Sequence, residues 1–208
     1  MKKRWKYKRV LAVVLTLMLF TGGVAMVQNI LDKQNDSFED DEVVKVEDSQ
    51  NKKTETKKEQ VLKAPVKENI GIVRYYYDQN DDITKQEQSL ILFEGVYRPN
   101  QGIDYSNKNE VFEVYAAMDG TVTKKTNDPV LGWVVTIMHD NKVSSTYQAL
   151  SEVKVDVNQI VKQGDLIGKS GENIYEADLK NHLHFVLQKD NQLLSPEKYI
   201  NKPLSQIK

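Results

Sequence analysis

The stretch GWVVTIMHDNKVSSTYQAL, residues 132–150, contains two candidate strands, Trp133–His139 and Lys142–Gln148, around the polar turn His139-Asp140-Asn141. Similar short segments recur on both sides of it, at Val111–Ala117, Thr121–Lys125, Leu166–Lys169 and His182–Gln188. The turns between them are Asp119-Gly120, Gln163-Gly164-Asp165 and Lys189-Asp190-Asn191. Regular short strands of this kind predict a mainly β domain built on an antiparallel sheet, which we place at residues 95–201.

The residues before this domain have strand character of their own. From Asn69 the chain becomes apolar, and residues 69–94 are interpreted as an N-terminal extension of the folded domain. Within it, Thr84–Glu87 resembles a capping box ahead of a short helix running through Leu90 to Phe93. At the other end, Ser195-Pro196-Glu197 predicts a short helix with proline at its first position, and residues 202–208 a C-terminal tail.

The N-terminal part of the chain is typical of a membrane anchor. Residues 1–9 carry six basic side chains and no acidic one, and residues 10–27 are free of charge. As a helix, those eighteen residues would span roughly 27 Å, close to the hydrocarbon thickness of a bilayer. The pattern predicts a transmembrane helix at 10–27 with the basic segment 1–9 in the cytoplasm. A cleaved signal peptide is the alternative, because Gly23-Val24-Ala25 satisfies a small-residue cleavage rule.

Residues 28–68 are predicted to be a charged flexible linker. Within Asp32–Lys63, 17 of 32 residues are charged and Phe38 is the one aromatic residue. Such a segment buries too little apolar surface to offset its chain entropy.

The chain of 208 residues has no cysteine and a formal net charge of -1. The absence of cysteine excludes disulfides, thiolate metal sites and a cysteine nucleophile. Without segment 1–9, 23 basic residues face 30 acidic ones. An acidic main body repels nucleic acid and anionic cell-wall polymers, so we expect neither as an electrostatic partner.

Two of the three histidines, His182 and His184, are separated by one residue in NHLHFVL, residues 181–187. On a strand both imidazoles project from one face, while Leu183, Phe185 and Leu187 pack on the other. A metal ligand next to an acid/base group needs that geometry. Taken alone the pair is weak evidence, since surface or partly buried histidines without a ligand fit it equally well.

The order of several motifs resembles the LytM-type (lysostaphin-like) zinc endopeptidases, which have the duplicated hybrid motif fold. GIDYS at 102–106 is followed by VYAAMDGTV, the stretch 132–150, VKQGDLIGKSG and HLHF, so that the resemblance covers Gly95 to Tyr199. It implies a β-sheet domain with a groove that holds one zinc. In such enzymes the ligands are a histidine, an aspartate four residues later and the second histidine of HxH, and two further histidines assist the attacking water.

This resemblance maps the aspartate ligand onto Asp104 and the second histidine ligand onto His184. One catalytic histidine maps onto His182. Asn100 stands where the first histidine ligand belongs, and Ala149 where the other catalytic histidine belongs. His139 matches none of these positions and is interpreted as structural or exposed.

Two losses predict a degenerate site. A catalytic zinc usually has three protein ligands and an open position for water, and an amide oxygen is a poor substitute for imidazole. Alanine neither donates a proton nor stabilises an oxyanion. We therefore expect no catalytic residue, no cofactor and no metal, beyond weak zinc binding by the remnant ligands Asp104 and His184. The alternative is a zinc metalloendopeptidase acting on peptidoglycan.

A third class, a lipoyl- or biotinyl-carrier module, is suggested by the turn at residues 161–168. Carriers need a lysine at a tight hairpin tip, and the equivalent stretch Ala116–Gly120 has none. We discount this class.

Four further stretches resemble a family of membrane-anchored sporulation proteins of endospore-forming bacteria, at residues 73–77, 97–99, 128–132 and 147–150. The resemblance implies a single-pass protein of the forespore membrane, with its C-terminal domain in the space between forespore and mother cell. It also implies a mother-cell membrane partner, stage III sporulation protein AH or an equivalent, in a ring-forming hetero-oligomer. Together they would support engulfment and a channel complex between the two cells. Exposed edge strands of a β domain suit binding by strand addition.

Overall fold

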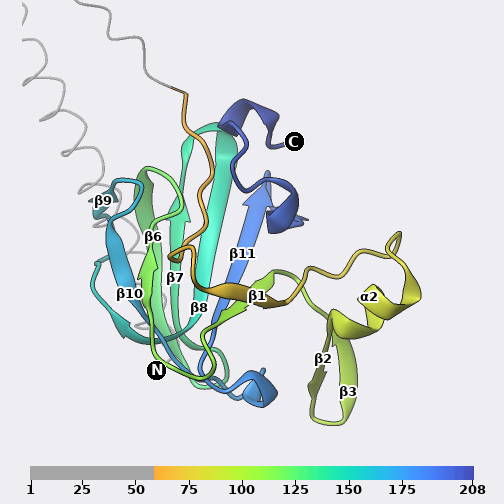
Figure 1. The fold of residues 1–208 in the computed structure, drawn as a ribbon. Helices are drawn as coiled ribbons and strands as arrows, with labels where there is room; N and C mark the ends of the chain where they lie inside the picture. The colour runs from red at the N-terminus through yellow and green to blue at the C-terminus, as the bar shows by residue number, and fades with distance from the viewer. Residues whose placement is uncertain (1–58) are drawn as a thin grey trace, which may run out of the picture. The chain divides into compact units, whose positions relative to one another are not determined.

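The computed structural model describes residues 59–208, which are built on an antiparallel sheet of ten strands and a separate two-stranded hairpin (Figure 1). The predicted segment 1–9, the predicted transmembrane helix 10–27 and most of the predicted linker lie outside the described residues. Within the described part, no helix is both long and apolar enough to cross a membrane.

The elements follow one another with short connections. The strands are β1 (Gly71–Arg74), β2 (Leu90–Phe93), β3 (Val96–Pro99), β4 (Ile103–Ser106), β5 (Glu113–Tyr115), β6 (Gly120–Asp128), β7 (Gly132–Met138), β8 (Val143–Val153), β9 (Ile160–Val161), β10 (Leu166–Ser170), β11 (Leu183–Lys189) and β12 (Gln192–Leu194). The helices are α2 (Ile83–Gln88) and the 3-10 turns Asp140–Lys142, Ala177–Leu179, Pro196–Lys198 and Leu204–Gln206.

Strand β8 organises the sheet. Its first half lies between β7 and β11, and its second half pairs with β10. The main path runs β1-β4-β11-β8-β7-β6-β9, with β12 added beside β11 and β5 beside β10. The antiparallel sheet predicted from the strand spacing is confirmed, although β8 is longer than expected.

The core lies along the inner face of this sheet. Leu183, Phe185 and Leu187 of β11 are fully buried, as their alternation with the histidines predicted. The rings of Tyr147 and Phe185 lie 5.4 Å apart between their centroids and fix β8 against β11.

The predicted helix through Leu90 to Phe93 is wrong. Helix α2 begins after Asp82, whose side chain accepts a hydrogen bond from the amide of Lys85, and it ends at Gln88 with Ser89 as its C-cap. The next four residues form strand β2 because Glu94 and Gly95 both have positive φ, 51° and 75°, and close a hairpin with β3. Figure 1 shows α2 and this hairpin projecting beyond the β1 edge of the sheet.

Both ends of the described chain are packed, which corrects two predicted boundaries. Leu62 and Val66 belong to the core although they fall within the predicted linker 28–68. Leu204 and Ile207 belong to the core although residues 202–208 were expected to be a tail. Val61 forms a β-bridge with Pro203, so the two ends hold each other in place. A few apolar side chains in charged surroundings were enough to bury these segments.

The predicted helix at Ser195–Glu197 is confirmed as a 3-10 turn with Pro196 at its start.

Candidate functional site

The pairing of β4 with β11 places Asp104 opposite His184. Within the motif GIDYS, Ile103–Ser106 forms strand β4 of the sheet. His184 Nδ1 lies 2.8 Å from Asp104 Oδ1, and both residues are buried. Two of the predicted site residues, far apart in sequence, therefore meet through strand register.

Gly102 allows the chain to enter β4 this close to β11. A Cβ atom at this position would lie 2.4 Å from the carbonyl oxygen of Phe185 and 3.0 Å from Nε2 of His184. No real Cβ contact is that short against backbone, so only glycine fits. This glycine of the motif has a packing role that needs no metal.

Asn100 lies just before β4 and its side-chain amide is fully used. Nδ2 donates to Asp104 Oδ2 at 3.0 Å and to the carbonyl oxygen of Tyr75 at 3.1 Å, while Oδ1 accepts from the amide of Gly102 at 3.3 Å. These three contacts fix the amide orientation, because its nitrogen faces two acceptors and its oxygen faces a donor. Asn100 thus presents hydrogens to the aspartate.

Glu176 is the site residue that sequence reasoning missed. Its side chain is fully buried between the two histidines, with Oε2 at 3.2 Å from His182 Nε2 and Oε1 at 3.1 Å from His184 Nδ1. Asn173 holds it in place by donating to Oε2 at 3.0 Å and by accepting from the Glu176 amide at 2.7 Å. The Asn-x-x-Glu spacing was the one available signal, since it allows such a reciprocal pair.

His182 is held from both sides of its ring. Nδ1 lies 2.7 Å from the carbonyl oxygen of Lys180, and Nε2 faces Glu176. The predicted projection of both histidines to one side of β11 is consistent with this arrangement, in which the Glu176 carboxylate joins them.

Arg74 also enters the cluster, from the end of β1. Its Nη2 forms an ion pair with Asp178, and its Nη1 lies 3.9 Å from Asp104 Oδ2 and 3.9 Å from Glu176 Oε1. Only 8% of the Arg74 side chain is exposed. We call Arg74, Asn100, Asp104, Glu176, His182 and His184 the buried polar cluster.

The carboxylates and imidazoles of the cluster shift one another's pKa values. Burial lowers the pKa of His184, but the charges of Glu176 and Asp104 outweigh burial and raise it to about 10. Burial raises the pKa of Asp104, and the charge of Glu176 raises it further. Burial by itself would raise the pKa of Glu176, but the facing histidines hold this pKa below its usual range.

Three residues of the cluster have the atoms of a metal site. The ligand atoms of Asp104, Glu176 and His184 lie within 4.8 Å of one another, and all three residues are buried. The structure thus brings the remnant ligands Asp104 and His184 together and adds the carboxylate of Glu176.

Ala149 lies on β8, next to Gln148, which is the register partner of His184. Ala149 is fully buried and has a positive φ of 58°. Gln148 and Ala149 together oppose the single residue Val134 of β7, so the strand bulges here. A methyl group at this position has no acid/base capacity.

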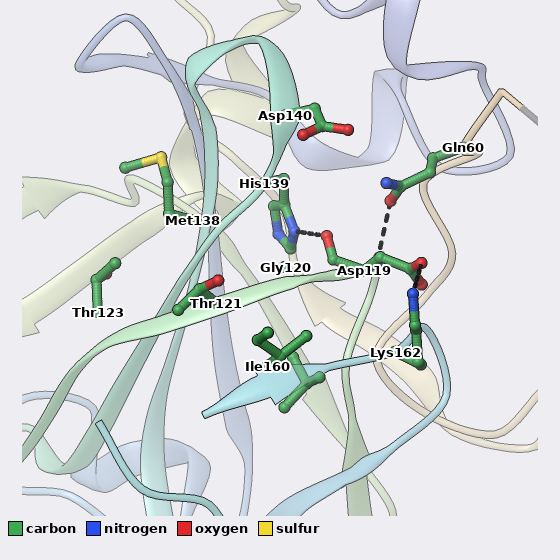
Figure 2. A pocket seen from close by; sticks show the side chains of 11 residues that line it. Gln60, Asp119, Gly120, Thr121, Thr123, Met138, His139, Asp140, Ile160 and Lys162 are labelled. Carbon is green, nitrogen blue, oxygen red and sulfur yellow. Dashed lines mark hydrogen bonds and ion pairs between the residues drawn. The ribbon is translucent and has the colours of Figure 1, made fainter. Parts of the chain in front are cut away.

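His139 is buried away from these residues and has a structural role. Its Nδ1 is 2.8 Å from the Asp119 carbonyl oxygen, and its Nε2 is 2.8 Å from Ser145 Oγ. It lines a pocket of about 420 Å³ in which Asp119 is also held by Gln60 and Lys162 (Figure 2). None of the buried polar cluster lines this pocket.

Peptidase family M23 matches residues 98–196 of this chain. Stage II sporulation protein Q of Bacillus subtilis (strain 168) is 40% identical over 141 residues, which make up 67% of this chain and 50% of that protein. A chain in the structure of the SpoIIQ-SpoIIIAH pore forming complex is 38% identical with a TM-score of 0.70, covering 71% of this chain and 96% of that chain. This chain belongs to the stage II sporulation protein Q family.

Membership of the stage II sporulation protein Q family agrees with both predicted resemblances. A zinc-containing peptidase from Vibrio cholerae is 22% identical with a TM-score of 0.54, covering 66% of this chain and 39% of that chain, which shows a shared fold alone. The match with the Bacillus subtilis protein spans half of that protein's length. Arg74 lies before the segment that the M23 family matches.

Proposed function

We propose that this chain is a non-catalytic sporulation protein whose folded domain binds a mother-cell membrane protein, stage III sporulation protein AH or an equivalent. One observation carries the proposal, namely the 38% identity over 96% of a chain in the SpoIIQ-SpoIIIAH complex. In this proposal residues 10–27 anchor the chain in the forespore membrane with the N-terminus in the cytoplasm. The domain then lies in the intermembrane space, where the pair forms a ring-shaped channel complex and supports engulfment.

The chemistry of the buried polar cluster supports a non-catalytic function. M23 peptidases imply zinc, and a ligand must offer the metal a lone pair. Asn100 instead turns its N–H₂ group toward Asp104. His184 Nδ1 faces carboxylate oxygens at 2.8 and 3.1 Å, so this nitrogen carries a hydrogen. The donor set therefore does not fit zinc.

Access to the cluster supports the same conclusion. Asn100, Asp104, His182, His184 and Glu176 are each at most 5% exposed. A peptidase has to bring a scissile bond to its metal and its general base. Side chains enclosed to this degree are more consistent with a structural role, and Ala149 supplies no acid or base.

The alternative, a zinc endopeptidase acting on peptidoglycan, is supported by the family-level match to residues 98–196 and by the ligand atoms of Asp104, Glu176 and His184. It requires a site that is both open and metal-binding.

Partner binding is tested by titrating the purified full chain with stage III sporulation protein AH of the same organism in a calorimeter. We expect a complex at micromolar concentrations or tighter. The variant His182→Gln should bind equally well, because His182 is fully buried and contributes nothing to a surface. An absence of binding by the folded wild-type chain would sink the proposed function.

A further inference from the structure

The guanidinium of Arg74 comes from outside the peptidase-like segment. Strand β1 pairs with β4 so that Arg74 is the register partner of Asp104, and the register shifts between Ile72 and Arg74. The strand that precedes the M23-matched residues 98–196 thus delivers a cation next to the aspartate that corresponds to a zinc ligand.

Two carboxylates, Asp104 and Glu176, are completely buried in the cluster. An isolated buried carboxylate is very costly unless a positive charge compensates it. Arg74 is always charged, and its Nη1 is at the same distance, 3.9 Å, from an oxygen of each. At this distance, and away from solvent, the guanidinium interacts strongly with both carboxylates.

The contact is one of charge rather than of hydrogen bonding. Within the described residues, Arg74 Nη1 is buried and lacks a hydrogen-bond partner. Glu176 Oε1, 3.9 Å from it, lies 3.1 Å from His184 Nδ1. The hydrogen bond of the guanidinium goes instead to Asp178, whose side chain is 57% exposed. Asp178 therefore orients Arg74 from the rim, and the buried carboxylates lie around its inner nitrogen.

The same extension encloses Asn100. The amide of Asn100 donates to the carbonyl oxygen of Ser89 at 2.9 Å, its carbonyl oxygen accepts from the amide of Tyr77 at 2.9 Å, and its side chain donates to Tyr75. The segment from Arg74 to Ser89 is consequently fastened to the residue that stands in place of the first histidine ligand.

We propose that Arg74 stands in for the metal of a zinc site, adding to His184 the positive charge that Asp104 and Glu176 require and excluding a divalent cation by repulsion. The N-terminal extension is then an internal plug of the site, held by Arg74 and Asn100. This inference concerns the site itself and does not depend on which protein the surface binds.

The first test compares stabilities in urea for the full chain. Removing one partner of a buried ion pair is strongly destabilising, so Arg74→Met should lower the unfolding midpoint by about 1–2 M. Asp178→Asn, which removes the exposed partner, should lower it by less than half as much. Lys67→Met is the matched surface control, since Lys67 pairs with Glu113 in solvent. Equal midpoints for Arg74→Met and Lys67→Met would overturn the proposal.

The second test titrates Zn²⁺ into chains that regain the missing imidazole. Asn100→His alone should bind Zn²⁺ on the order of a hundredfold more weakly than Asn100→His with Arg74→Gln, because the guanidinium repels the ion. Asn100→His with Lys67→Gln controls for loss of charge elsewhere and should match the single variant. Equal affinity with and without Arg74 would contradict the proposal, as would the absence of zinc binding by the double variant. Tight binding by the wild-type chain that depends on Asp104 and His184 would contradict it too.

Discussion

Asn100 Nδ2 donates a hydrogen bond of 3.0 Å to Oδ2 of Asp104, four residues later in the chain. In the resembling zinc peptidases this four-residue spacing separates two metal ligands. Here the first residue donates a hydrogen bond directly to the second instead of offering a lone pair to a metal. The spacing is the same, but the chemical role of the first residue differs. The other carboxylate oxygen of Asp104, Oδ1, forms a hydrogen bond with Nδ1 of His184. Asp104 is thereby satisfied by protein groups.

Replacing Asn100 with alanine should destabilise the domain. Asp104 would lose a donor while it remains buried, and the carbonyl oxygen of Tyr75 would lose one too, so we expect a loss of about 2–3 kcal/mol in the free energy of unfolding. Urea denaturation measures this loss. The partly exposed Asn107, which contacts Glu110 at 3.3 Å, provides the control, and Asn107→Ala should change stability by less than about 0.5 kcal/mol. Similar losses for both variants would contradict the role given to Asn100.

Stability should fall at alkaline pH through His184. Its pKa is raised from 6.5 to about 10 on folding. A raised pKa stabilises the fold fully below pH 6.5, and that contribution is lost as pH rises from 6.5 through about 10. Unfolding free energies of the wild-type chain and of His184→Gln, measured from pH 6 to 10, should therefore converge as pH rises. Parallel curves would show that His184 carries no such charge.

The stability of the domain at acidic pH depends on Glu176. Its pKa is held below the ordinary 4.5, so its contribution is present above pH 4.5 and disappears as pH falls below it. Glu176→Gln should be less stable than the wild-type chain at neutral pH, and the difference should shrink in acid. Circular dichroism during acid titration measures both chains. A difference that stays constant down to pH 3 would argue against a charged Glu176.

A second buried contact lies at the phenol of Tyr147, which accepts hydrogen bonds from the amide of Ala117 at 2.9 Å and from Ser145 at 3.0 Å. Tyr147→Phe should cost about 1–3 kcal/mol, since it leaves the buried amide without a partner. The comparison is Tyr97→Phe, whose ring is 66% exposed and should be nearly neutral. Thermal unfolding of the two variants decides the point, and equal melting temperatures would refute it.

The hairpin turn offers a stabilising substitution. Glu94 adopts a positive φ of 51°, a conformation that asparagine tolerates better than glutamate. Glu94→Asn should stabilise β2–β3 by about 0.5–1 kcal/mol, and Glu94→Val should destabilise it by at least that amount. Hydrogen exchange at the backbone amides within Leu90–Pro99 measures the local stability of this hairpin. Slower exchange in the valine variant would be incompatible with the turn described.

The antiparallel sheet could be predicted because it follows from the local pattern of short strands and turns. That Asp104 and His184 belong to one site was implied by the resemblance to LytM-type peptidases. The strand Leu90–Phe93 was mistaken for helix because a run of four apolar residues shows neither helical nor strand periodicity. The turn at Glu94-Gly95 decides that this segment pairs as a strand. Leu62 was assigned to the flexible linker because charged neighbours dominate that segment, and Ile207 was assigned to a C-terminal tail.

The other two charged residues of the site could not be predicted from the sequence, for a different reason. Glu176 and Arg74 are ordinary charged residues in sequence, and such residues are almost never fully buried unless they are paired. Their burial results from the pairing of β1 with β4 and from the loop that Asn173 closes. Only the three-dimensional register shows that these two charges compensate each other.

The most direct test of the central claim is the zinc content of the wild-type full chain after incubation with Zn²⁺ and dialysis against metal-free buffer, measured by plasma mass spectrometry. The buried polar cluster described above predicts much less than one zinc ion per chain, and the same residual content in His184→Ala. One zinc ion per chain in the wild type that His184→Ala loses would contradict the account and restore the metallopeptidase.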